Sequence, residues 1–312
     1  MQRILGLILL SCIIILQLPN TVCLAQEAFP IGPPIDVNTF IDSNQMRPSV
    51  SALTSGGFVV VWQSRYQDGS DYGVYGHLFN SFGTKVGSEF QVNAYSLDDQ
   101  RDPYVASLDD GRFLVVWASD WTANLTEVDV YGQIFLDSGD KVGSEFKVNT
   151  FTDRYWRDNP SVGVFTDSSF IVVWDSWEQD GSSDGVFGQL FNSSGSMIGS
   201  EFQVNTHTFS NQRNASVATF SDNGFVVVWQ SWGVDEEWEG IAGQIFDSSG
   251  AKIGAEFQVN TYSDAGQISP SVAAFTDDSF VVVWESSGQD TDSWGIFGQR
   301  FESSGAGSTT DR

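Results

Sequence analysis

Aromatic rings stand beside acidic side chains in the polar segments that separate the apolar runs of this 312-residue chain. A ring offers a flat apolar face and a carboxylate offers hydrogen-bond acceptors. Together they suit a ligand with apolar faces and hydroxyl edges, such as a sugar. The alternative is that the rings pack between adjacent loops and only fix the rim of the fold. The candidate ligand-binding residues are Tyr66, Tyr72, Trp121, Trp156, Trp177, Trp232, Trp238 and Trp294.

The same polar segments place acidic oxygens close together, as in QDGSD (67–71), QDGSSD (179–184) and QDTD (289–292). Calcium prefers such hard oxygen ligands, but none of the three matches the twelve-residue loop that ends in a glutamate. A solvated loop is therefore favoured over a metal site, and calcium is the one cofactor that the sequence leaves open. The weak metal candidates are Asp68, Asp180, Asp290 and Asp292.

The elements that must position these residues form a repeat. The string FVVVW at 58–62 returns as FLVVW (113–117), FIVVW (170–174), FVVVW (225–229) and FVVVW (280–284). The tryptophans that end these strings are 55 to 57 residues apart, and a fixed period of this size is typical of propellers and solenoids. We expect five core tryptophans: Trp62, Trp117, Trp174, Trp229 and Trp284.

Each period contains four β-prone segments separated by turn residues, for example PSVAAF (270–275), FVVVWES (280–286), GIFGQRF (295–301) and AEFQVNT (255–261). FVVVW is apolar on both faces and must be buried on both, whereas EFQVN alternates and must be half exposed. This gradient is typical of a four-stranded propeller blade. One slot of the third segment holds glutamine in four repeats and histidine in the first, which predicts a repeated internal hydrogen bond at His77, Gln133, Gln189, Gln244 and Gln299.

The two ends of the chain complement each other. IDVNTF (35–40) resembles a fourth strand without the three that should precede it, and GIFGQRFESSG (295–305) is a third strand without its fourth. Pairing residues 34–39 beside 295–302 closes a ring and removes two exposed sheet edges. The sequence therefore predicts an all-β, five-bladed β-propeller with four antiparallel strands per blade, closed by the N-terminal strand pairing with the last blade. An open solenoid gains nothing from this offset, and sandwich domains need about 100 residues each.

The motifs GSEFQVN, PSVA, FVVVW, QDGS, VFGQ and SSG resemble a repeat that occurs in tandem in large secreted and surface proteins of bacteria and some protists. This resemblance covers nearly all of the chain after the first 25 residues and implies an exported adhesive or scaffolding module. At the level of fold alone, the predicted ring is similar to the five-bladed tachylectins and the five-bladed glycoside hydrolases.

Residues 1–25 have the pattern of an export signal, with Arg3, an apolar run over 4–18 and cleavage before Gln26. An uncleaved anchor is the alternative, although the apolar run is shorter than the roughly 20 residues of a membrane span. Both cysteines lie inside this segment, so the rest of the chain has neither disulfides nor a cysteine nucleophile. We expect one propeller domain over 26–305, a disordered tail over 306–312, and a secreted or cell-surface location without membrane insertion after cleavage.

The chain carries 40 acidic against 14 basic residues and a net charge of −26, which disfavours nucleic acid as a partner. Catalysis finds little support, because the inner segments SVSAL, YVASL, SVGVF, SVATF and SVAAF contain no acid, and the chain has only His77 and His207 as histidines. We therefore expect no enzyme, but a secreted non-catalytic module that binds glycans or surface proteins, most plausibly carbohydrate. A structural surface or extracellular matrix protein without a small-molecule ligand is the alternative, and a glycoside hydrolase ranks last.

Overall fold

A computed structural model describes residues 32–120, 127–151, 156–234 and 238–303. The chain divides into two units, Met1–Ile35 and Asp36–Arg312. Of the first unit only 32–35 are described, and they contain no helix or strand. The expected export signal (1–25) and tail (306–312) lie outside the described residues. Within the described part of the chain, no helix has the length and apolarity that crossing a membrane requires.

The second unit carries 19 described strands in five antiparallel sheets. The first sheet contains β1 (Gln45–Ala52), β2 (Phe58–Arg65), β3 (Tyr72–Phe79) and β4 (Lys85–Gln91). The second contains β5 (Gln100–Leu108), β6 (Arg112–Asp120), β7 (Val128–Leu136) and β8 (Lys141–Lys147). The third contains β9 (Arg157–Val164), β10 (Phe170–Trp177), β11 (Asp184–Phe191) and β12 (Met197–Gln203). The fourth contains β13 (Gln212–Thr219), β14 (Phe225–Trp232), β15 (Glu239–Phe246) and β16 (Lys252–Gln258). The fifth contains β17 (Gln267–Ala274), β18 (Phe280–Ser287) and β19 (Trp294–Phe301).

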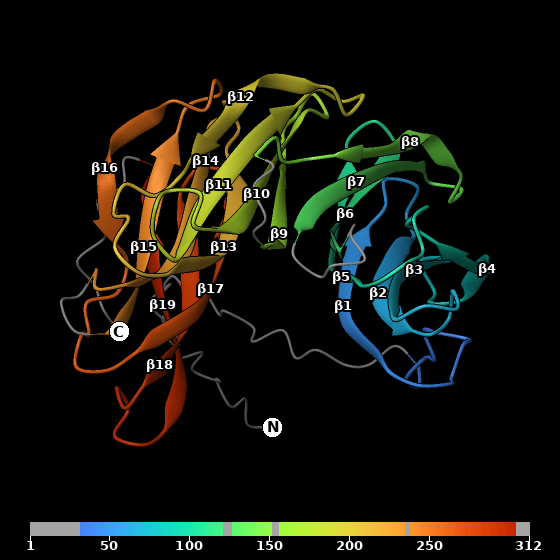
Figure 1. Ribbon diagram of the computed structural model, residues 1–312, viewed down its shortest axis with the longest axis horizontal. Helices are drawn as coiled ribbons and strands as arrows, with labels where there is room; N and C mark the ends of the chain where they lie inside the picture. Colours follow the sequence, from blue (N-terminus) through green and yellow to red (C-terminus); the bar gives the residue numbers. More distant parts are fainter. Residues whose placement is uncertain (1–31, 121–126, 152–155, 235–237, 304–312) are drawn as a thin grey trace, which may run out of the picture. The chain divides into compact units, whose positions relative to one another are not determined.

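Each sheet is built from consecutive strands, so its strands carry neighbouring colours in Figure 1. The first strand of each sheet packs on the first strand of the next, from β1 against β5 to β13 against β17. The all-β class and the repeating sheet of antiparallel strands are as predicted, and the arrangement is consistent with a five-bladed propeller.

The core lies between successive sheets. Val172 and Trp174 of β10 pack in one cluster with Leu114 and Val116 of β6, as the two-sided apolarity of the FVVVW strings requires. The five repeat tryptophans are all buried, with the side chain of Trp174 fully enclosed. The prediction of five core tryptophans is confirmed.

The glutamine slot makes the predicted repeated bond in the second, third and fourth sheets, whereas neither ring nitrogen of His77 in the first sheet has a hydrogen-bond partner among the described residues. The side-chain amide of Gln189 donates to the carbonyl of Leu190 at 2.9 Å and to that of Ile198 in the fourth strand at 3.0 Å. Gln133 and Gln244 make the equivalent pairs of bonds. The slot therefore ties the outermost strand to its sheet.

The fifth sheet differs from the other four. It has three strands, and residues 34–39 form no strand. Ile296 in β19 is 74% exposed, whereas its counterparts Val74, Val130, Val186 and Ile241 are fully buried. The predicted pairing of the N-terminal segment with the last sheet is not formed in this structure.

The inner strands begin earlier than the sequence predicts, because each contains a β-bulge near its start. The bulge residues have left-handed φ angles between 48° and 56° and are Arg47, Asp102, Asn159, Asn214 and Ser269. A bulge re-aims side chains and lets a strand pass a proline such as Pro160. The expectation that the inner strands carry no acid is therefore wrong, because β5 includes Asp102 and β9 includes Asp158.

Candidate functional site

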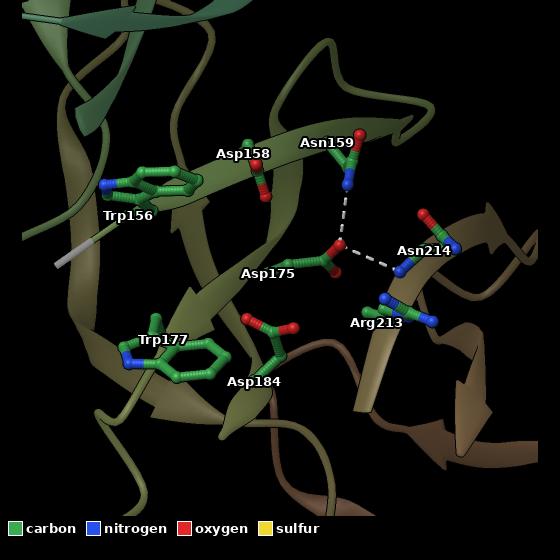
Figure 2. A pocket seen from close by; sticks show the side chains of 8 residues that line it. All are labelled: Trp156, Asp158, Asn159, Asp175, Trp177, Asp184, Arg213 and Asn214. Atoms are coloured by element: carbon green, nitrogen blue, oxygen red, sulfur yellow. Dashed lines mark hydrogen bonds between the residues drawn. The ribbon is translucent and has the colours of Figure 1, made fainter. Parts of the chain in front are cut away.

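A cavity of 540 Å³ lies where strands of the third sheet meet the start of β13. Figure 2 shows its lining, in which carboxylates converge between two tryptophans and a group of amide and guanidinium side chains. The residues that line it are Trp156, Asp158, Asn159, Asp175, Trp177, Asp184, Arg213 and Asn214.

Two of the aspartates are cross-strand neighbours. Asp158 in β9 is paired in register with Asp175 in β10. Side chains directly opposite each other in an antiparallel pair have Cβ atoms about 4.5–5.5 Å apart, and like charges in such a pair repel. The fold thus holds two carboxyl groups where they cannot both ionise without cost.

Asp175 is the buried member of the pair, with only 2% of its surface exposed. Its Oδ2 accepts a hydrogen bond from the side-chain amide of Asn159 at 2.9 Å and from the backbone N–H of Asn214 at 2.8 Å. Both bonds are drawn in Figure 2. Its Oδ1 has no hydrogen-bond partner among the described residues. Burial, followed by repulsion from Asp158, raises the pKa of Asp175 well above its usual value.

Asp158 and Asp184 approach Asp175 from opposite sides in Figure 2. Burial raises the pKa of Asp158 from 3.8 to about 6, against the opposing effect of Arg101. Burial also raises the pKa of Asp184, but the nearby Arg213 opposes that rise. The three acids therefore sit in different environments, which is the arrangement that separates a proton donor from an ionised carboxylate.

Two of the predicted aromatic residues form a wall of this cavity. Trp156 immediately precedes β9 and is 58% exposed, and Trp177 ends β10 and is 39% exposed. Figure 2 shows both rings on the same side of the three aspartates. Their exposed faces are available for stacking beside hydrogen-bonding groups, the combination that sugar recognition uses.

The other predicted binding residues are dispersed. Tyr72 and Trp294 begin third strands and Trp232 ends β14, so these rings lie at strand ends rather than inside loops. Tyr72 lies on a second cavity, whereas Tyr66, Trp232, Trp238 and Trp294 line neither cavity. Trp121 lies outside the described residues.

The predicted calcium ligands have other partners. Asp68, Asp180 and Asp290 each accept the backbone N–H of the residue two positions on, at 3.1, 3.1 and 3.4 Å respectively. These bonds fold the loop on itself, as aspartates commonly do in turns. Asp292 is exposed. In the described ranges, no group of three or more His, Cys, Asp or Glu side chains could hold a metal ion, and calcium stays a prediction.

No protein-family model and no curated protein matches the chain, but solved structures resemble it. An α-L-arabinofuranosidase from Fusarium graminearum, solved with an iminosugar inhibitor, is 14% identical; 85% of this chain and 82% of that chain are covered, with a TM-score of 0.56. An α-L-arabinanase from Penicillium chrysogenum, complexed with arabinobiose, is 15% identical; the coverages are 85% and 83% and the TM-score is 0.54. An endo-arabinase from Bacteroides thetaiotaomicron is 10% identical, with coverages of 84% and 96% and a TM-score of 0.50. At these identities the likeness establishes the fold.

These neighbours correct the functional expectation. The sequence favoured a non-catalytic binding module and ranked a glycoside hydrolase last, yet the resembling structures are glycoside hydrolases. The error has a physical origin. The apolar pattern predicts an inner strand that starts at Ser161 and leaves Asp158 out of the sheet, and nothing in the pattern marks Asp175 or Asp184 as catalytic. The available signal was Asp158, an acid in a repeat slot where the other repeats carry Met46, Arg101, Arg213 and Ile268.

Proposed function

We propose that this protein hydrolyses glycosidic bonds in the cavity formed by Asp158, Asp175 and Asp184. The observation that carries the proposal is the cross-strand pair of Asp158 and Asp175 in a cavity walled by two exposed tryptophans. Glycoside hydrolysis requires one carboxyl group that holds a proton near neutral pH and one that is ionised. The arabinofuranosidase and arabinanase neighbours support the same chemistry at the level of fold.

In this proposal Asp158 is the general acid. Its pKa of about 6 lets it hold a proton near neutral pH and release it to the oxygen of the departing sugar as the bond to the anomeric carbon breaks. We assign the second carboxylate to Asp184, whose pKa is raised by burial and lowered in part by the nearby Arg213. It stabilises the positive charge that develops on the sugar and accepts a proton from the water that attacks the anomeric carbon.

Asp175 is a positioning residue. Its carboxyl group fixes Asn159 and the start of β13 through two hydrogen bonds. The raised pKa of Asp175 lessens the repulsion between two carboxyl groups that lie opposite each other. Trp156 and Trp177 hold the sugar ring by stacking, and the surrounding residues exclude bulk water from the acid.

The test is hydrolysis of a panel of neutral polysaccharides, with arabinan included because of the structural neighbours. The wild type should release reducing sugar from at least one of them. Asp158→Asn and Asp184→Asn should each lower kcat by about 10²–10⁴-fold at an unchanged melting temperature. Asp109→Asn, in the exposed turn after β5, is the matched control and should retain full activity. No release from any glycan, or equal activity in all four proteins, would overturn the proposal.

The closed ring is part of the same proposal, and the N-terminal segment supports it. The side-chain amide of Asn38 donates to the carbonyl of Phe40 at 2.7 Å, as that of Asn260, at the end of a complete sheet, donates to the carbonyl of Tyr262 at 2.9 Å. Val37 packs with the buried residues of the first sheet. The backbone N–H of Thr39 donates to Glu89 at 2.7 Å, a contact that later repeats also make.

One repeated hydrogen bond is missing from the N-terminal segment and would form if the ring closed. In the four complete sheets, the Oδ1 of the asparagine that follows the fourth strand accepts the N–H of Val74, Val130, Val186 or Ile241. Ile296 is the corresponding donor for Asn38. Asn38→Ala should therefore lower the melting temperature about as much as Asn260→Ala. A much smaller effect at Asn38 would contradict closure.

We also propose that the protein acts outside the cell, at the surface or in the medium. The support is the export pattern of residues 1–25 and the large negative charge. Detection of the mature N-terminus at Gln26 in the culture medium or cell-surface fraction tests this location.

A further inference from the structure

We propose that the cavity of Asp158 is one half of a longer binding groove that takes an internal stretch of a neutral polysaccharide, so that the chain is cleaved within the polymer rather than at its ends. This inference rests on the proposed hydrolase function and adds the substrate class and the site of cleavage. Its basis is a second cavity that shares a wall with the first.

The second cavity is 600 Å³ in volume, beside 540 Å³ for the first. Trp156, Asp158 and Asn159 line both, so the two spaces adjoin along these three residues. Ligand pockets for drug-sized molecules span about 300–1,000 Å³, and either cavity alone is therefore large enough for a short sugar. Two adjoining cavities of this size suit a longer chain.

The position of Asp158 determines where along the bound polysaccharide the bond is cleaved. Asp158, the proposed proton donor, belongs to both cavities, and the remaining acids of the first cavity lie on one side of it. A site for the chain end needs sugar-binding space on only one side of the bond that breaks. Here space is present on both sides of the acid, which places sugar residues on both sides of the cleaved bond.

The charges in the second cavity select a neutral chain. Arg101 is held by Asp120 at 3.1 Å and lies 3.7 Å from Asp102, which is also paired with Arg47 at 3.3 Å. The two cations of this cavity are thus occupied by its own carboxylates, and Asp99 adds a further negative charge. An acidic sugar would meet unfavourable charge here, whereas hydroxyl groups find acceptors in the carboxylates.

Tyr72 provides an aromatic surface in the second cavity, as Trp177 does in the first. Its backbone N–H is fixed by Asp99 at 3.2 Å, and the Arg65 guanidinium lies 5.7 Å from the ring centre. The backbone bond to Asp99 stays in place when the Tyr72 side chain is changed. Removal of the ring should therefore weaken hydrolysis of long substrates, which reach the second cavity, more than hydrolysis of short ones.

The experiment measures kcat/KM on a series of neutral oligosaccharides of increasing length cut from the best polymer substrate. In the wild type, kcat/KM should rise with length, and early products from the polymer should be internal fragments. Tyr72→Ala should lower kcat/KM for long chains about 10-fold more than for the shortest substrate, the size expected for one lost stacking contact. Tyr72→Phe, which keeps the ring, should restore the length dependence. Phe82→Ala, an exposed ring in the turn before β4, should leave the ratio unchanged.

Equal losses at every length in Tyr72→Ala, or release of sugars only from chain ends, would overturn the inference while leaving the hydrolase intact. Faster hydrolysis of a uronic-acid polymer than of a neutral one would overturn the neutral substrate class. Absence of hydrolysis on every substrate would overturn the proposed function, and this inference with it.

Discussion

The third and fourth sheets have the same backbone frame but carry different charges in one cross-strand pair. Asp158 and Asp175 are paired in register across β9 and β10, and Arg213 and Gln230 are paired in the same way across β13 and β14. The residue that begins the third strand is Asp184 in one sheet and Glu239 in the other. In the fourth sheet Arg213 is neutralised by Glu239 at 2.7 Å, whereas the third sheet gathers three acids.

The residue that follows the core tryptophan is Asp175 in the third sheet and a glutamine in the fourth and first sheets, so the backbone of the sheet does not require an acid at this position. Gln230 accepts the side-chain amide of Asn214 at 3.0 Å, and Gln63 accepts the backbone N–H of Asp102 at 3.0 Å. Asp175 accepts the equivalent bonds with one carboxyl oxygen. Since a neutral amide serves the structural purpose in two other sheets, the acid in the third sheet is an addition to the frame, and its raised pKa is a cost of that addition.

The largest expected effect separates the two acids of the cross-strand pair in the third sheet. Asp158→Asn removes the proposed proton donor, so hydrolysis should fall by about 10²–10⁴-fold. Asp175→Asn puts an amide in the slot where the fourth sheet carries Gln230 and keeps an oxygen for the bonds to Asn159 and Asn214. It should therefore retain most of the activity, while its melting temperature at pH 7 should stay the same or rise. An equal loss of activity in the two variants would contradict the positioning role of Asp175.

The next effect is the difference in stability between removing a core tryptophan and removing a cavity tryptophan from the same strand. Trp174 is fully buried in β10, and Trp177 at the end of that strand is 39% exposed. Trp174→Ala should lower the free energy of unfolding by about 3–5 kcal/mol, the usual cost for a large buried aromatic. Trp177→Ala should cost less than about 1 kcal/mol. Denaturant titration of both variants measures the difference, and similar losses would mean that Trp177 is a core residue.

The repeated parts of this fold could be predicted from the sequence, because they depend on local patterns. A string that is apolar on both faces must be buried, and five copies at one period imply five stacked sheets. The Gln189 slot could be predicted for the same reason. The closing pair could only be proposed, since the described Ile296 remains exposed.

The site could not be predicted in the same way, because it depends on pairing between strands. Asp158 lies before the bulge at Asn159, and the following Pro160 looked like the start of a strand rather than its interior. Nothing local distinguishes Asp175 from a polar residue at a strand end. Burial raises the pKa of both acids, and for Asp175 the register that sets it opposite Asp158 adds to the rise.

A smaller effect concerns how stability depends on pH. The pKa of Asp158 is about 6 in the folded protein against 3.8 for an ordinary aspartate. Between about pH 4 and 6 the folded state therefore binds more protons than the unfolded state, and the free energy of unfolding falls as pH rises. Asp158→Asn removes this term, so the variant should gain stability relative to the wild type across that window, by at most about 1.4 kcal/mol per pH unit. Above about pH 7 the difference should be constant. Parallel pH profiles for the two proteins would contradict the buried environment of Asp158.

The smallest expected effect is a change in KM on removal of the tryptophan that ends the second strand, in the third sheet compared with the fourth. Trp177 is paired with Asp184 at the open end of the third sheet, and Trp232 is paired with Glu239 at the same place in the fourth. The two rings are similarly exposed, at 39% and 37%, but only Trp177 lines the cavity of the three aspartates. Trp177→Ala should raise KM for a short glycan about 10-fold, which corresponds to the loss of one stacking contact of about 1.4 kcal/mol. Trp232→Ala should leave KM unchanged, with the melting temperatures of both variants close to that of the wild type. Equal changes in KM would mean that the two sheets share the work of binding, and that the acids of the third sheet do not mark the place where the sugar sits.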